Sequence, residues 1–221
     1  IDVQQIDDGW QGDQYRTWRP VPPRYPAGWR RVRQAAHQAR VQLGLWAAWV
    51  IGLDDLKDTW RQGGFRYYKI DFAKLETYQQ VDALFTKMRR LIEYAGHSVR
   101  VNWDVTENPA RVGYYFARDL GNIYLENRKP KIPQQVVYVP YLVLRDAWHV
   151  ARYTNLNRFQ ITVQNVSRVN PDVSNAHLHS HSYALAIALA GSPIFFQETT
   201  LLSQDARREI RTLLAHYRRE R

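Results

Sequence analysis

The stretch GGFRYYKIDF, at residues 63–72, decides the fold. Its two glycines mark a turn, and residues 65–72 then predict a largely apolar strand that carries the acidic side chain of Asp71 near its end. Apolar residues at helical spacing predict a helix over about 78–94, and a second strand is expected over 99–105. A strand, a helix and a further strand in this order predict two parallel strands joined by a crossover helix.

The same alternation continues on both sides of this stretch. Strands are predicted at 3–6, 41–49, 65–72, 99–105, 122–125, 159–163 and 193–197. Helices are predicted at 29–40, 78–94, 109–120, 139–153, 179–190 and, with Ser203 as N-cap, 204–219. The acidic pair Asp54-Asp55 indicates the first turn of one more helix, where negative charge favours the helix dipole. The sequence therefore predicts an α/β protein with parallel strands.

Polar residues gather where the predicted strands end. They are Asp7-Asp8, Asp71, Asp104, Glu126-Asn127-Arg128, Gln164-Asn165 and Gln197-Glu198. A TIM (β/α)8-type barrel places its active site at this end of its strands, so one such barrel is expected over residues 1–221. A closed barrel has eight strands and seven are found, so one strand is missing, borrowed or undetected. A doubly wound open sheet is the alternative, although no glycine-rich phosphate loop opens a helix.

Composition excludes several classes of protein. The chain has no cysteine, so disulfides, thiolate nucleophiles and cysteine-ligated metals are excluded. No apolar run approaches the roughly 18 residues of a membrane span, and no membrane partner is expected. The net charge of +10 is scattered rather than gathered in one tract, so nucleic acid is not an expected partner. The chain begins Ile1-Asp2-Val3 with neither methionine nor signal segment, which indicates a processed, excised or engineered end.

The candidate chemistry centres on Asp71, which ends a stiff apolar strand. Glycoside hydrolysis needs two carboxyl groups beside the anomeric carbon, one as acid and one as base or nucleophile. Lys69 lies two residues earlier and so points to the same side of the strand, where its ammonium group can keep Asp71 ionised and donate to sugar hydroxyls. The alternative is a purely structural Lys-Asp pair.

Several short motifs together resemble glycoside hydrolase clan D, and most closely the bacterial melibiase-type α-galactosidases of families 36 and 27. These motifs are Ile6-Asp7-Asp8-Gly9-Trp10, Gly44-Leu45-Trp46, Lys69-Ile70-Asp71, Ile123-Tyr124-Leu125-Glu126-Asn127-Arg128, Leu144-Arg145-Asp146-Ala147-Trp148 and Phe159-Gln160-Ile161. Their order and spacing extend the resemblance over nearly the whole chain. By the family's count the strand ending at Asp71 is the fourth of the barrel, so the first strand is the one that is absent.

The resemblance implies roles for individual residues. Asp71 corresponds to the nucleophile, and Lys69 to a lysine that binds sugar hydroxyls. The paired aspartates Asp7 and Asp8 correspond to the residues that bind the 4- and 6-hydroxyls of galactose.

Further positions follow from the same resemblance. Trp10 and Trp46 are expected to form the floor or wall of the sugar pocket, and Asn102 and Asp104 to contact the sugar near its 2-hydroxyl.

The sequence departs from the family at the acid/base. Related proteins carry an aspartate three residues beyond the arginine of the sixth-strand motif, and Lys131 stands there instead. A lysine replaces a carboxylic acid poorly because its usual pKa is far above neutral. Glu126 is the nearest carboxylate and is the candidate acid/base, while Arg128 is expected either to bind a substrate hydroxyl or to pair with a carboxylate.

The expected function is that of a retaining exo-glycosidase that hydrolyses α-galactosides or a closely related glycoside, with a carbohydrate as its partner and no cofactor. The alternative is a non-catalytic carbohydrate-binding barrel, or an engineered or truncated fragment with little activity. A metal site at His177, His179 and His181 is not expected, because the segment opens a predicted helix. Homo-oligomer formation is left open, and only the resemblance favours a secreted or periplasmic location.

Overall fold

The computed structural model describes residues 2–12, 15–104, 113–125, 129–132, 135–137, 140–163, 178–195 and 199–220. The chain divides into two compact units, Ile1–Ile123 and Tyr124–Arg221. Within the described residues, no helix has both the length and the apolar character needed to cross a membrane.

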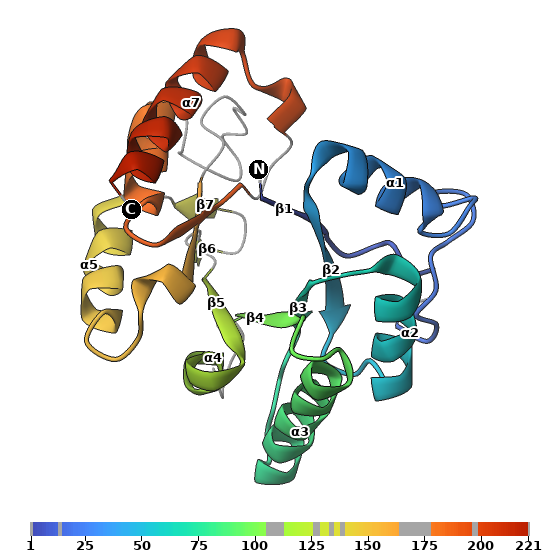
Figure 1. Ribbon diagram of the computed structural model, residues 1–221. Helices are drawn as coiled ribbons and strands as arrows, with labels where there is room; N and C mark the ends of the chain where they lie inside the picture. The colour runs from blue at the N-terminus through green and yellow to red at the C-terminus, as the bar shows by residue number, and fades with distance from the viewer. Residues whose placement is uncertain are drawn as a thin grey trace. The chain divides into compact units, whose positions relative to one another are not determined.

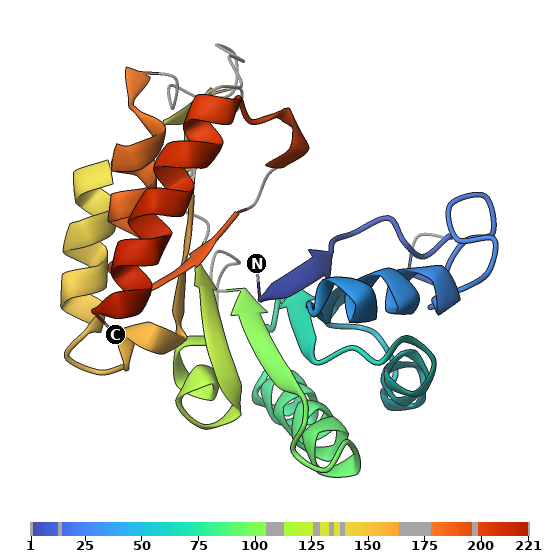
Figure 2. The same ribbon diagram turned by 45° about the horizontal axis from the view of Figure 1, so that its top comes forward.

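In the first unit, strands and helices alternate along the chain (Figure 1). The elements are β1 (Val3–Ile6), α1 (Arg30–Ala39), β2 (Gln42–Ala48), α2 (Leu53–Gly63), β3 (Tyr67–Asp71), α3 (Tyr78–Tyr94), β4 (Arg100–Asp104) and α4 (Gly113–Leu120). Strands β1, β2, β3 and β4 lie side by side in this order, and all of their pairings are parallel. Helices α1, α2 and α3 lie on one side of these strands, as Figure 2 also shows.

The register of the strands separates an apolar face from a polar one. Leu45, Tyr68 and Val101 are in register, and all three are fully buried. The neighbouring residues in register, Trp46, Lys69 and Asn102, point to the opposite face because side chains alternate along a strand. Ala48 and Asp71 continue this second face toward the carboxyl ends of the strands. The fold thus places the functional candidates in adjacent positions on one face.

Local sequence explains where the helices begin and end. Thr77 caps α3 by accepting a hydrogen bond from the backbone N–H of Gln80 at 3.2 Å, and the Gln80 side chain accepts from the N–H of Thr77 at 3.1 Å. This reciprocal capping box satisfies two N–H groups that have no partner inside the helix. Helix α2 carries Asp54 and Asp55 in its first turn, as expected, and ends at Gly64, whose φ of 66° is left-handed.

The second unit repeats the strand–helix alternation. Its elements are α5 (Pro140–Val150), the short 3-10 helix η1 (Leu156–Arg158), β8 (Phe159–Thr162), α6 (His181–Ala188), β9 (Ser192–Ile194) and α7 (Gln204–Arg219). Strands β8 and β9 pair in parallel, and β5 (Gly121–Leu125) spans the boundary between the units. Ser203 caps α7 through a 3.2 Å hydrogen bond from Ala206, as the sequence predicts.

The α/β class and the seven predicted strands are confirmed. The strand predicted at 193–197 lies slightly earlier, at Ser192–Ile194. An antiparallel pair, β6 (Lys129–Ile132) with β7 (Gln135–Val137), was not predicted, because its lysines and proline lack the composition of a strand. A single (β/α)-barrel domain over residues 1–221, without the first strand, stays a prediction.

Candidate active site

Asp71 lies at the carboxyl end of β3 and is only 6% exposed. Its Oδ2 accepts a hydrogen bond from the indole Nε1 of Trp46 at 2.7 Å, and its Oδ1 accepts one from the backbone N–H of Phe72 at 2.8 Å. The N–H of Trp49, just after β2, donates to the main-chain carbonyl of Asp71 at 2.9 Å. The carboxylate is therefore fixed in position through its own strand and the neighbouring one.

Lys69 places a positive charge between two carboxylates. Its Nζ lies 3.0 Å from Oδ2 of Asp71 and 3.7 Å from Oδ1 of Asp7, which follows β1. The lysine is 4% exposed, so its charge is screened less by water than a surface charge would be. Three of the predicted site residues thus lie together: Lys69 and Asp71 on β3, and Asp7 in the turn after β1.

The pKa values of Asp71 and Asp7 are shifted in opposite directions. Burial by itself raises the pKa of Asp71, but the charge of Lys69 and the hydrogen bonds from Trp46, Lys69 and Phe72 outweigh it and hold the pKa below its usual value. Burial raises the pKa of Asp7, and the more distant charge of Lys69 only partly opposes this. Asp71 is accordingly an ionised carboxylate at neutral pH, which suits a nucleophile.

Asp8 has a different environment from Asp7. Its Oδ1 accepts hydrogen bonds from the N–H of Gly9 and from Nε2 of Gln11, both at 2.7 Å, and its Oδ2 accepts one from the hydroxyl of Tyr15 at 3.1 Å. Both oxygens of Asp8 therefore hold the turn after β1 together. Oδ2 of Asp7 has no hydrogen-bond partner among the described residues and can accept one from a ligand.

The predicted aromatic residues Trp10 and Trp46 are both buried, at 0% and 1% exposure. The indole of Trp10 donates to the main-chain carbonyl of Trp46 at 2.8 Å, and its ring packs against Trp18 and Trp29. In this structure Trp10 supports Trp46, and Trp46 in turn supports Asp71. Neither ring presents an open face.

Two aromatic residues that the sequence did not suggest lie over Trp46. Its ring centroid is 5.6 Å from that of Tyr15 and 5.5 Å from that of Phe72, and the centroids of Tyr15 and Phe72 are 6.0 Å apart. Phe72 directly follows Asp71, which is a signal that sequence reasoning had available. Tyr15 follows a loop whose path the sequence does not reveal.

Several solved structures that are similar to this chain are α-galactosidases. One is the galactosidase domain of the α-galactosidase–sucrose kinase AgaSK, with a TM-score of 0.77 and 14% sequence identity. The alignment covers 99% of this chain and 36% of the AgaSK domain. Another is α-galactosidase I from Mortierella vinacea, with a TM-score of 0.63 and 13% identity; the alignment covers 95% of this chain and 61% of that protein. A third is a variant of the GH36 α-galactosidase AgaA from Geobacillus stearothermophilus in complex with raffinose, with a TM-score of 0.56 and 13% identity. The alignment covers 99% of this chain and 37% of AgaA.

The chain has the fold of the clan D α-galactosidases. The family resemblance seen in the sequence is thus confirmed at the level of the fold. The chain spans about a third of the length of AgaSK's galactosidase domain and of AgaA. Neither a protein family model nor a curated protein matches the sequence.

The other predicted site residues have different placements. The side-chain amide of Asn102 is buried and donates to Oε1 of Gln5 at 3.3 Å, so β4 and β1 meet on the polar face. Asp104 ends β4, and its side chain lies outside the described residues. Glu126 and Arg128 also lie outside the described residues.

The histidine segment gives no sign of a metal site in the parts of the chain that the structure describes. His177 lies outside those parts. The ring of His179 lies 5.6 Å from that of Tyr183, and burial lowers the pKa of His181 while the charge of Glu209 opposes this.

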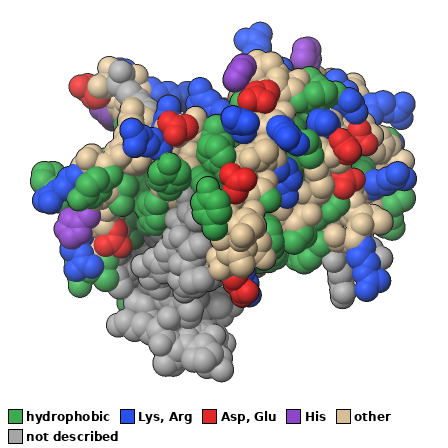
Figure 3. Space-filling view, turned by 90° about the horizontal axis from the view of Figure 1, so that it is seen from below, with side chains coloured by type: hydrophobic (Ala, Val, Ile, Leu, Met, Phe, Trp, Pro, Cys, Tyr) green, Lys and Arg blue, Asp and Glu red, His purple; other side chains and the backbone are tan. Residues whose placement is uncertain are grey.

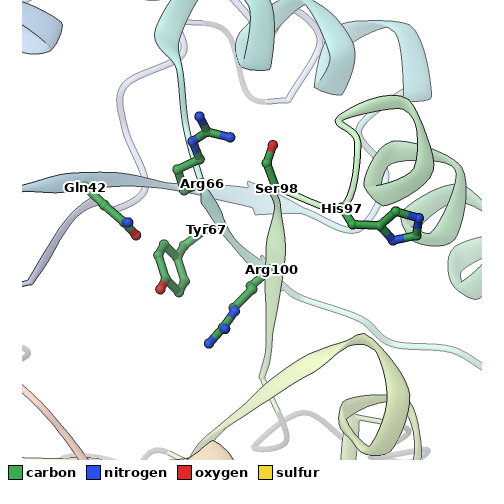
Figure 4. Close-up of a pocket in the computed structure, with 6 residues that line it drawn as sticks. All are labelled: Gln42, Arg66, Tyr67, His97, Ser98 and Arg100. Atoms are coloured by element: carbon green, nitrogen blue, oxygen red, sulfur yellow. The ribbon is translucent and has the colours of Figure 1, made fainter.

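A hollow of about 360 Å³ lies at the opposite, amino ends of β2, β3 and β4 (Figure 4). It is lined by Gln42, Arg66, Tyr67, His97, Ser98 and Arg100. Figure 4 shows that the side chains of Arg66 and Arg100 point in different directions, so their guanidinium groups do not converge on one anion. On the face seen in Figure 3, Lys and Arg side chains are likewise scattered among acidic and apolar ones.

Proposed function

We propose that this chain is the catalytic barrel, or most of it, of a retaining exo-glycosidase that acts on α-galactosides or closely related glycosides. The observation that carries the proposal is the ionised, buried Asp71 at a strand end, held by Lys69 and Trp46. The shared fold with α-galactosidases supports the same reaction class.

Asp71 acts as the nucleophile in this proposal. Its Oδ2 accepts from Trp46 and lies 3.0 Å from Nζ of Lys69, whereas among the described residues its Oδ1 accepts from the N–H of Phe72 alone. Oδ1 is the less engaged oxygen and attacks the anomeric carbon as the bond to the leaving oxygen breaks. Glu126 donates a proton to that oxygen, and water, deprotonated by Glu126, then displaces Asp71 to release the sugar.

The remaining polar residues bind the sugar hydroxyls. Oδ2 of Asp7 accepts from one hydroxyl, and the ammonium of Lys69 donates to another while it keeps Asp71 ionised. Asp8 contributes by shaping the turn and, with its hydrogen bond from Tyr15 kept, by accepting from a sugar hydroxyl at the remaining lone pair of Oδ2. Asn102, Asp104 and Arg128 complete the binding set, and the reaction needs no cofactor.

Replacement of the nucleophile tests this proposal. The variant Asp71→Asn is expected to hydrolyse 4-nitrophenyl α-galactoside at least about 10³-fold more slowly than the unchanged chain. Asp54→Asn is the matched control, because the Asp54 side chain is 95% exposed on α2 and should leave the rate unchanged. Undiminished turnover by Asp71→Asn would remove the proposal, and NMR detection of a first-formed β-sugar would exclude retention.

A non-catalytic carbohydrate-binding barrel is the second candidate, favoured by Lys131 at the position where related proteins carry the acid. A 2,4-dinitrophenyl galactoside separates the two, because its leaving group needs no protonation. A rapid burst of dinitrophenolate indicates a working nucleophile even if Glu126 is not the acid. Galactose binding without any burst favours the binding protein.

A further inference from the structure

Two aromatic residues beside Asp71 share an uncommon backbone conformation. Phe72 has a φ of 55° and Tyr15 a φ of 67°, both in the left-handed region. Bulky side chains rarely adopt this region, and residues held there are concentrated at functional sites. At Phe72 the conformation accompanies a backbone N–H that donates to Asp71. The chain therefore maintains a strained turn directly at the candidate nucleophile.

The same turn leaves one aromatic ring open to solvent. Phe72 is 39% exposed, although its ring packs edge-on against Trp46 at an interplanar angle of 76° and against Tyr15 at 67°. Trp46 is buried behind it. Phe72, the residue after Asp71, thus offers the solvent an apolar ring surface that the buried Trp46 does not.

Tyr15 is fixed in a way that braces the ring of Phe72. Its hydroxyl donates to Oδ2 of Asp8 at 3.1 Å, and its ring stacks on that of Trp18 at a centroid distance of 6.0 Å. Burial of the hydroxyl, and then the charge of Asp8, raise the pKa of Tyr15, so Tyr15 remains a neutral donor at neutral pH. Tyr15 therefore links the acidic turn after β1 to the aromatic surface next to Asp71.

We propose that Phe72, braced by Tyr15, is the apolar wall against which the substrate packs beside the nucleophile, in place of the buried Trp46 and Trp10. An aromatic ring suits this because it offers dispersion contact to the C–H groups of a pyranose or to an aromatic leaving group. The inference rests on the proposed function for its choice of a galactoside as ligand.

Two substitutions at Phe72 test the wall. Phe72→Gly adopts the left-handed backbone without strain and keeps the backbone N–H that donates a hydrogen bond to Asp71, but it removes the ring. Phe72→Leu keeps apolar bulk without an aromatic face. Both variants are expected to raise the dissociation constant for 4-nitrophenyl α-galactoside or galactose by roughly five- to tenfold. Tyr78→Leu is the control, since Tyr78 is 79% exposed on α3 and should bind as the unchanged chain does.

Binding is measured by calorimetry with every variant carrying Asp71→Asn in addition, so that the aryl galactoside is not hydrolysed during the titration. A weaker affinity for both ligands places the wall at the sugar, and a weaker affinity for the aryl galactoside alone places it at the leaving group; either result supports the inference. Unchanged affinities in folded Phe72→Gly and Phe72→Leu would overturn it, whatever the catalytic rate. If the unchanged chain binds but does not turn over, only the proposed function fails, and if it binds neither ligand, both proposals fail.

Discussion

Replacement of Trp46 by Phe should raise the pKa of Asp71 without removing either of the carboxylates proposed to be catalytic. The indole N–H of Trp46 lies 2.7 Å from Oδ2 of Asp71, and both residues are almost fully buried. A hydrogen bond to a charged acceptor contributes about 1.5–3 kcal/mol. If that contribution is lost from the ionised form alone, 1.36 kcal/mol per pKa unit gives a rise of about 1–2 units.

The pH dependence of kcat/KM for an aryl α-galactoside measures this shift. The proposed mechanism needs ionised Asp71, so the acidic limb of the profile should move to higher pH by about 1–2 units in Trp46→Phe. Trp18→Phe is the matched control: Trp18 belongs to the same aromatic cluster but makes no hydrogen bond to Asp71 among the described residues. An acidic limb that coincides in Trp46→Phe and the unchanged chain would refute the reasoning.

Unfolding gives a second, activity-independent measurement. Because the folded-state pKa of Asp71 lies below the unfolded value, near 3.8, this residue adds stability above pH 3.8 that is lost as pH falls through the folded pKa. Trp46→Phe weakens that contribution. The difference in unfolding free energy between the variant and the unchanged chain should therefore shrink as pH falls from 6 to 3. The smaller ring of Phe lowers stability at every pH and does not produce this trend.

Two further substitutions test the electrostatics and the fold. Lys69→Met leaves Asp7 and Asp71 as neighbouring charges without a cation and should lower stability by about 3–5 kcal/mol at pH 7. Since both carboxyl pKa values then rise and protonation removes the repulsion, urea unfolding should show a smaller loss at pH 4; an equal loss at both pH values would contradict this. Thr77→Ala removes the capping box of α3 and should lower the unfolding free energy by about 1 kcal/mol with little change in kcat, and an unchanged urea midpoint would show that the cap contributes nothing.

Hydrophobic periodicity in the sequence was enough to predict the α/β pattern. The apolar run of β3 and the amphipathic helix α3 were predicted close to their observed limits, because strand and helix periods are local properties. The meeting of Asp7, Lys69 and Asp71 was also predictable, since parallel strands bring their carboxyl ends to one edge.

Tertiary packing alone decided how the side chains around Asp71 are used. Trp46 was expected to face the sugar, but in the structure its ring is covered and its indole donates to Asp71. Tyr15 approaches Phe72 from a loop 57 positions earlier in the chain, and Asn102 reaches Gln5 across 97 positions. Exposure, hydrogen-bond direction and pKa depend on such contacts between distant segments, and the spacing of residues along a chain does not specify them.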